Sequence, residues 1–123
     1  MANWSISEGD FCFVEIPASD QDAAQRFYGS VFDWKFDPMP DMGFTMIKTS
    51  EDGVLGGFGR LFKEAKGPLV SIMVRGDMSE TLAKVKAAGG EVVVGETVIE
   101  GMGSAALIKD PDGNLIGLSR DPD

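Results

Sequence analysis

The amino-acid sequence predicts an α+β fold in which two βαβββ modules form paired curved mixed sheets around a cleft. The same order of elements, a strand, a helix and three strands, occurs twice along the chain. A short segment also repeats, because DGVLGGF at residues 52–58 aligns with DGNLIGL at residues 112–118. Such self-similarity indicates a duplicated structural unit. One unit alone would leave a sheet face bare, so two are expected to pair, and the trough between them would suit a ligand.

Module one is predicted to span about residues 9–61. Its first strand, residues 11–17, has strand-like alternation and ends at Pro17, which has no N–H to donate. Either Ser19 or Asp20 can cap the helix that follows. The apolar positions of that helix recur three and four residues apart, and we expect this stripe to pack on the sheet. Its members are Ala24, Phe27, Tyr28 and Val31.

Three more strands complete module one. One begins at residues 34–36, and the Pro, Asp and Gly content of residues 37–43 then predicts a loop. The next two cover residues 44–49 and 54–61, with a hairpin-turn signal at residues 51–53 between them. The second of these strands is rich in glycine, which would let it bend or leave room for a ligand.

Residues 62–68 are the predicted linker, and module two spans about residues 69–120, so that the whole chain forms one domain. Module two opens with a strand at residues 69–75. A helix capped by Asp77 follows, and the Gly-Gly pair at residues 89–90 supplies its left-handed C-terminal cap. The buried stripe of this helix is expected to be Leu82, Val85 and Ala88.

The last three strands are predicted at residues 91–95, 105–109 and 115–119. The run of three valines in the first of them favours a strand buried on both faces. The sequence DPDG at residues 110–113 is a turn signal between the other two strands. This segment lacks the glycine that a calcium-binding EF-hand loop needs at its sixth position.

Composition limits the range of partners. The chain has 123 residues, the length of one domain, and its hydrophobic fraction of 43% is enough for a packed core. The formal net charge of -9 argues against nucleic acid, because phosphates would be repelled. No apolar run approaches the roughly 20 residues that cross a bilayer, and no signal-peptide pattern opens the chain, so no membrane partner is expected.

The chain contains no histidine and one cysteine, Cys12. Without histidine, neither a Ser-His-Asp nor a Cys-His catalytic unit can form, and the usual ligand of zinc, nickel and iron is missing. We interpret Cys12 as a small core residue, since nothing is available to activate its thiol. A single cysteine fits a reducing compartment and therefore a cytoplasmic location.

Several motifs resemble those of one superfamily. In the first half these are FVEIP at residues 13–17, D-x-x-x-A-x-x-FY at 20–28 and VFDW at 31–34. In the second half they are LAKVKAAGGEV, GMG and DPDGNLIGL, which lie between residues 82 and 118. Over about residues 9–120 the chain resembles the vicinal oxygen chelate superfamily, which includes glyoxalase I, bleomycin resistance proteins and extradiol dioxygenases. The resemblance implies two βαβββ modules around a U-shaped cleft, usually in a homodimer.

The resemblance also identifies where a metal would be bound. Metal-dependent relatives draw four ligands from the first and last strands of the two modules. The aligned positions here are Phe13, Gly57 (or Gly56 if the register slips), Val70 and Gly117. None of these side chains can bind a metal, so we expect no metal and no cofactor.

Glu15 is a candidate catalytic residue, because it shares a strand face with Phe13 and could point into the cleft. A structural role is favoured, in which it pairs with Arg60 or Arg75 or lies in solvent. If it were buried and unpaired, its pKa would rise and it could act as an acid or base. The predicted cleft residues are Phe13, Glu15, Met46, Gly57, Val70, Ile72, Leu107 and Gly117.

From these observations we expect metal-independent binding of a small organic ligand in an apolar cleft of a homodimer. Whether the protein is an enzyme is left open. One alternative is a metal-dependent lyase or isomerase resembling glyoxalase I, with non-standard ligands such as Glu15 and loop carboxylates. Another is a non-catalytic interaction module whose cleft is filled by its own aromatic side chains. Trp4, in an N-terminal arm, is expected to cover a dimer partner.

Overall fold

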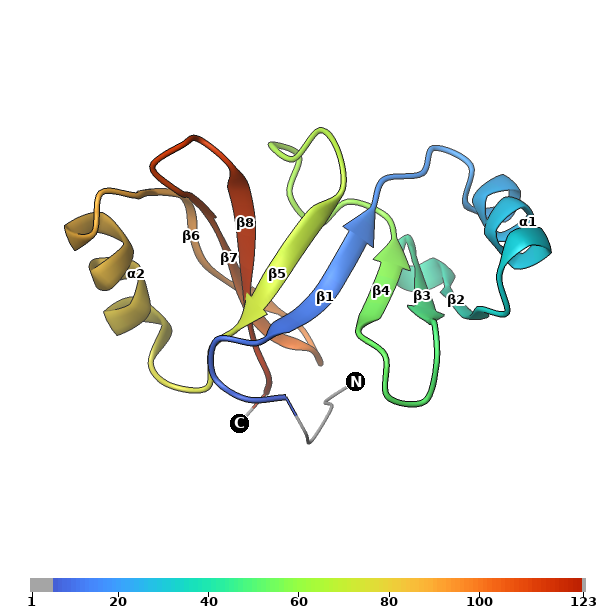
Figure 1. Ribbon diagram of the computed structural model, residues 1–123, viewed down its shortest axis with the longest axis horizontal. Coiled ribbons are helices and arrows are strands. Elements are labelled where there is room, and N and C mark those ends of the chain that lie inside the picture. Colours follow the sequence, from blue (N-terminus) through green and yellow to red (C-terminus); the bar gives the residue numbers. More distant parts are fainter. Residues whose placement is uncertain (1–5, 123) are drawn as a thin grey trace. The chain divides into compact units, whose positions relative to one another are not determined.

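The computed structural model of the chain describes residues 6–122. A strand, a helix and three strands occur twice in succession, which confirms the two predicted βαβββ modules and the α+β class (Figure 1). The chain divides into two compact units. The first unit is Phe13–Leu69, and the second is Met1–Cys12 with Val70–Asp123, as far as these residues are described.

The first unit contains one α-helix and four strands in the order β2-β3-β4-β1. β1 and β4 run parallel, whereas the other neighbouring strands are antiparallel. Its elements are β1 (Phe11–Ile16), which begins in the second unit, α1 (Gln21–Val31), β2 (Lys35–Met39), the 3-10 helix η1 (Pro40–Met42), β3 (Phe44–Lys48) and β4 (Leu55–Phe58).

Two boundaries in the first unit differ from the predictions by more than one residue. Residues 37–39 belong to β2 rather than to a loop, because each of them pairs with a residue of β3. β2 is an edge strand of this unit, where Pro38 can be accommodated without losing a ladder hydrogen bond. β4 ends at Phe58, three residues early, because Gly59 has a φ of 140° that takes the backbone out of the strand conformation.

The helix α1 begins where it was predicted to begin. Asp20 is its N-cap and accepts a hydrogen bond from the Ala23 N–H at 3.0 Å. The predicted apolar stripe is wrong for two of its members, since Phe27 is 62% and Val31 58% exposed. The periodicity therefore located the helix correctly but overestimated the width of its buried face.

Aromatic rings make the contact between α1 and its sheet. The Tyr28 ring stacks on Trp34 with centroids 5.0 Å apart and lies 5.6 Å from Phe58. Phe58 is fully buried and stacks in turn on Phe36. Tyr28 thus supplies the helix side of this contact, whereas Phe27 and Val31 stay exposed.

The second unit contains one α-helix and four strands in the order β5-β8-β7-β6. β5 and β8 run parallel, and the remaining neighbours are antiparallel. The elements of this unit are β5 (Leu69–Met73), α2 (Met78–Ala87), β6 (Glu91–Ile99), β7 (Gly103–Lys109) and β8 (Leu115–Arg120).

Neither α-helix described here, in either unit, has the length and apolar character of a membrane-spanning segment.

Both predicted ends of α2 are confirmed. The Asp77 carboxylate accepts a hydrogen bond from the Ser79 N–H at 2.8 Å. At the other end Gly89 has a φ of 95°, and the Gly90 N–H donates to the Val85 carbonyl at 2.9 Å, the Schellman arrangement. A buried cluster lies between α2 and its sheet and consists of Val74, Met78, Ala106 and Leu118. Three partly buried residues pack against this cluster, namely Ile72, Leu82 and Ile108.

The strand β6 is longer and less buried than predicted. It extends to Ile99, and its three valines at residues 92–94 are half-buried, so their expected burial on both faces is wrong. Among the described strands, β6 has β7 as its only neighbour. An edge strand has fewer side chains packed around it, which explains the partial exposure.

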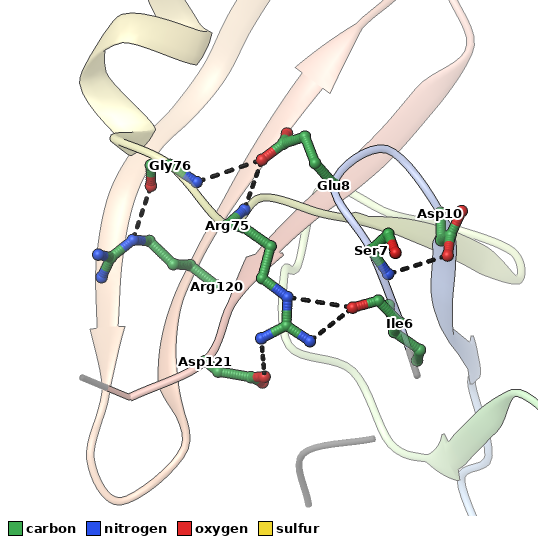
Figure 2. Close-up of polar contacts among 8 residues, drawn as sticks. All are labelled: Ile6, Ser7, Glu8, Asp10, Arg75, Gly76, Arg120 and Asp121. Carbon is green, nitrogen blue, oxygen red and sulfur yellow. Dashed lines mark hydrogen bonds and ion pairs between the residues drawn. The ribbon is translucent and has the colours of Figure 1, made fainter. Parts of the chain in front are cut away.

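A group of polar contacts fixes the N-terminal segment of the second unit to the end of β5 (Figure 2). The Arg75 guanidinium donates two hydrogen bonds to the Ile6 carbonyl, at 3.1 and 2.6 Å, and forms an ion pair with Asp121 at 3.0 Å. The Glu8 carboxylate accepts hydrogen bonds from the N–H groups of Arg75 and Gly76, at 2.6 and 3.2 Å. The hydrogen bonds and the ion pair of the Arg75 side chain described here are thus made with residues of its own unit.

Candidate ligand-binding site

Four of the predicted cleft residues lie together on one face of the sheet in the first unit. In the parallel pairing of β1 with β4, Glu15 lies opposite Gly57. In the antiparallel pairing of β3 with β4, Met46 lies opposite the same glycine. Directly opposed residues point to the same side of a sheet, as do residues two apart in a strand, which adds Phe13 and Phe44. We call these five residues the Glu15 face.

The Phe44 side chain fills the space that was expected to be empty at Gly57. A Cβ atom added to Gly57 or to Gly59 would overlap the Phe44 ring. The ring also stacks on Phe13, with centroids 6.0 Å apart. The two glycines therefore form a slot for an aromatic ring, which corrects the interpretation that Gly57 leaves open room.

Glu15 is the buried polar residue of this face, with only 2% of its surface exposed. Its Oε1 accepts a hydrogen bond from the Leu61 N–H at 2.9 Å. Its Oε2 is buried and has no hydrogen-bond partner among the described residues. Burial raises the pKa of the Glu15 carboxyl, while the Leu61 hydrogen bond and the positive charge of Arg60 act in the opposite direction.

The expected placement of Glu15 in solvent or in an ion pair needs correction. The side chain is buried, and Arg75 pairs with Asp121 instead. Arg60 acts on Glu15 as a nearby charge rather than through a short ion pair in the described structure. A buried carboxyl with one fixed oxygen and one unpartnered oxygen can exchange a proton with, or hydrogen-bond to, a bound molecule.

The predicted cleft residues of the second unit divide between two faces. Leu107 lies opposite Gly117 in the pairing of β7 with β8, so these two share a face. Ile72 lies opposite Leu118 and packs against the buried cluster beneath α2. Val70, two residues before Ile72, is on that helix-side face by strand alternation. Val70 and Ile72 are therefore not on the same face as Gly117.

The strand register also changes the alignment of the two modules. Glu15 lies opposite Gly57 in the first unit, and Ser71 lies opposite Gly117 in the second. Matching these pairs makes Leu69, rather than Val70, the counterpart of Phe13. A one-residue slip moves a side chain to the opposite face, so the predicted match of Phe13 with Val70 is one residue out in β5.

None of the positions that correspond to metal ligands carries a donor atom. With the corrected register they hold Phe13, Gly57, Leu69 and Gly117. Among residues 6–122 no group of three or more His, Cys, Asp or Glu side chains is placed to hold a metal ion. The metal used by metal-dependent members of the resembled superfamily does not fit these residues, because it needs oxygen, nitrogen or thiolate ligands.

A shallow apolar hollow of about 260 Å³ lies on the opposite face of the sheet in the first unit, the side of α1. Single-residue strand alternation places Val14 and Ile16 there, away from Glu15. Sequence reasoning did not identify this hollow, since its residues have the pattern of ordinary core positions. Its lining consists of Val14, Ile16, Trp34, Ile47, Thr49, Val54, Leu55 and Gly56.

Comparison with known sequences agrees with this architecture. Residues 10–50 match the family model described as "Bleomycin resistance protein-like N-terminal". Two relatives named "Putative glyoxylase CFP32", from Mycobacterium bovis and Mycobacterium tuberculosis, are 28% identical to the chain over 113 residues. The matched region covers 86% of this chain and 43% of each relative, so the chain spans less than half the length of these proteins.

Solved structures show the same fold. Methylmalonyl-CoA epimerase from Mycobacterium tuberculosis has a TM-score of 0.68 at 17% identity and covers 100% of this chain and 94% of its own. A glyoxalase/bleomycin resistance protein/dioxygenase superfamily member from Vibrio splendidus has a TM-score of 0.62 at 20% identity, with coverages of 89% and 97%. Identities this low establish the fold alone. Together with the sequence relatives, they confirm the resemblance to the vicinal oxygen chelate superfamily.

Proposed function

We propose that the chain binds a small organic molecule on the Glu15 face without the help of a metal ion. The observation that carries this proposal is the absence of donor atoms at the four positions aligned with metal ligands, where Phe13, Gly57, Leu69 and Gly117 stand. Without metal ligands at these positions, the Glu15 face can hold a guest but cannot polarise it as a metal ion would.

The composition of the Glu15 face supports a small organic ligand. Phe13, Phe44 and Met46 supply apolar surface, and the Glu15 carboxyl supplies one polar group. Small-molecule sites usually combine an apolar lining with a few polar groups that fix orientation. Methionine and stacked aromatic rings also adapt their positions to different guests.

A second candidate function is that of a metal-dependent lyase or isomerase with non-standard ligands. The unpartnered Oε2 of Glu15 favours it, because a carboxylate oxygen is a metal ligand. So do the names of similar proteins, a glyoxylase and an epimerase. A third candidate, an interaction module closed by its own aromatics, is favoured by the Phe44 ring in the slot of Gly57.

Calorimetry separates these candidates. Ni²⁺, Zn²⁺, Fe²⁺ and Mn²⁺ are titrated in turn into the wild-type protein and into the Glu15→Gln and Glu51→Gln variants. Glu51 is the matched control, since its side chain is 88% exposed. We expect no tight, stoichiometric binding of these metals by any of the three proteins. Tight binding that Glu15→Gln removes and Glu51→Gln retains would overturn the proposal in favour of the metal enzyme.

The same samples, kept in chelator, are then screened against uncharged aromatic molecules by ligand-observed NMR. Binding in the presence of chelator supports the proposed function. Failure of every molecule to bind, to the wild type and to Phe44→Ala alike, would favour the interaction module instead.

We also propose that the protein is a cytoplasmic homodimer. The resembled superfamily usually forms homodimers, and α1 exposes Phe27 and Val31, which a partner could cover. The cysteine Cys12 is a free, buried thiol, as expected in a reducing compartment. Trp4, the residue expected to cover a partner, lies outside the described residues. Native mass spectrometry tests the assembly, and a purely monomeric protein at micromolar concentration would contradict it.

A further inference from the structure

We propose that Glu15 holds its ligand as a neutral carboxylic acid, with Oε2–H donating a hydrogen bond to a carbonyl oxygen of an uncharged, largely apolar molecule. The ligand class is therefore ketones, aldehydes, esters or amides with a hydrocarbon body. This inference rests on the proposed function, because it specifies what the Glu15 face binds.

The hydrogen-bond geometry of Glu15 distinguishes its two oxygens. Oε1 accepts from the Leu61 N–H at 2.9 Å and therefore has the role of the carbonyl oxygen of an acid. Oε2 is left as the hydroxyl oxygen, which needs an acceptor. Among the described residues it has no partner, although it is buried. A buried polar atom without a partner is unfavourable, and a bound carbonyl group would remove that cost.

The burial of Glu15 favours the neutral form. Phe13, Phe44 and Met46, the side chains of this face that surround Glu15, do not titrate. The same face also carries Lys48 of β3, which pairs with Glu51, and the charged residues Lys35 and Asp37 of β2, one strand further from Glu15. Arg60, an exposed residue just beyond β4, is the charged group that acts on the carboxyl. Burial raises the pKa of Glu15 and is the largest influence on it, ahead of the Leu61 hydrogen bond and of Arg60.

Access to Oε2 involves the Phe44 ring. Gly57 is the cross-strand neighbour of Glu15, and the Phe44 ring occupies the side-chain space of Gly57. The ring thus lies beside the carboxyl and is itself half-buried. A ligand that reaches Oε2 displaces this ring from the slot and replaces its apolar contacts with those of its own hydrocarbon body.

Three probes of the same carbon skeleton test the inference: acetophenone, ethylbenzene and the 1-phenylethylammonium cation. Their affinities are measured by NMR titration in chelator at pH 5, for the wild type and for Glu15→Gln, Glu15→Leu and Val54→Trp. Val54, 41% exposed, lines the apolar hollow on the opposite face, so its replacement is the control for binding there. Circular dichroism confirms that each variant is folded before its affinities are used.

We expect the wild type to bind acetophenone roughly 3- to 10-fold more tightly than ethylbenzene, because the ketone gains one neutral hydrogen bond. The cation should bind most weakly of the three probes. Glu15→Gln should keep the preference for the ketone, because its amide can donate in place of Oε2–H while its oxygen still accepts from Leu61. Glu15→Leu should lose the preference, and Val54→Trp should keep it. In the wild type the preference should decline as pH rises through the raised pKa of Glu15, whereas in Glu15→Gln it should not.

Each contrary result has a distinct meaning. Equal affinity for the ketone and the hydrocarbon would overturn the inference and leave the proposed function intact. Tightest binding of the cation would also overturn it, because the carboxyl would then be ionised. Loss of ketone binding in Val54→Trp but not in Glu15→Leu would move the ligand to the hollow and overturn it. If none of the probes binds to the wild type, both the inference and the proposed function fail.

Discussion

Replacing Glu15 with glutamine should change how the stability of the protein depends on pH. The folded-state pKa of Glu15 is raised above its ordinary value of 4.5, chiefly by burial. A raised pKa means that the favourable contribution of this group is complete below about 4.5 and is lost as pH rises through the folded-state pKa. The wild type should therefore lose stability relative to Glu15→Gln as pH increases from 4.5 towards 8.

The size of this effect follows from the environment of Oε2. The side chain is 2% exposed, and this oxygen has no partner among the described residues. A buried neutral polar atom without a partner costs about 1–3 kcal/mol, and a charged one costs more. Glu15→Gln keeps the neutral cost, so the extra cost of the charge, of a similar size, is the difference between the two proteins at high pH. With a urea m-value of about 1–3 kcal/mol/M, the transition midpoint of Glu15→Gln should exceed that of the wild type by roughly 1 M at pH 8.

Equilibrium urea unfolding at pH 4, 6 and 8 measures the difference, with Glu51→Gln as the control. Glu51 undergoes the same chemical change at an exposed position, where it pairs with Lys48. Exposed ion pairs contribute little, so this control should follow the wild type at each pH. A stability difference between Glu15→Gln and the wild type that stays constant over this range would show that Glu15 does not titrate with a raised pKa.

Two further substitutions test the packing of each unit by urea unfolding. Gly57→Ala should destabilise the protein by about 1–3 kcal/mol, because the new Cβ displaces the Phe44 ring, whereas Gly95→Ala meets no atom within 4 Å and should be nearly neutral. An equal effect of the two would contradict the slot described for Phe44. Met78→Ala should cost about 2–5 kcal/mol, since Met78 is 1% exposed in the buried cluster beneath α2. Met42→Ala, at a 44% exposed residue, should cost far less.

Features that depend on neighbouring residues could be predicted from the sequence. The caps Asp20 and Asp77 and the C-terminal pair Gly89-Gly90 act within one turn of their helices, so local patterns located them. The alternation of β1 also placed Glu15 beside Phe13 on one face. These choices follow from backbone geometry that three to seven residues already determine.

Features that depend on distant residues could not be predicted. The Leu61 N–H that binds Glu15 is 46 positions away along the chain. The exposure of Phe27 depends on which residues of α1 meet the sheet, which helical periodicity alone does not determine. The register of β5 against β8 moved the counterpart of Phe13 by one residue, and no local signal fixes such a register.

NMR shift mapping reports where a carbonyl-bearing molecule binds in the absence of metal, and so whether it binds at Glu15. Backbone amide shifts of the wild type are recorded in chelator during titration with acetophenone. We expect the largest changes at Leu61, whose N–H donates to Glu15 Oε1, and at Gly57 and Phe44 on the same face. Changes centred on Trp34 and the apolar hollow, or changes that appear only after a divalent metal replaces the chelator, would contradict this expectation.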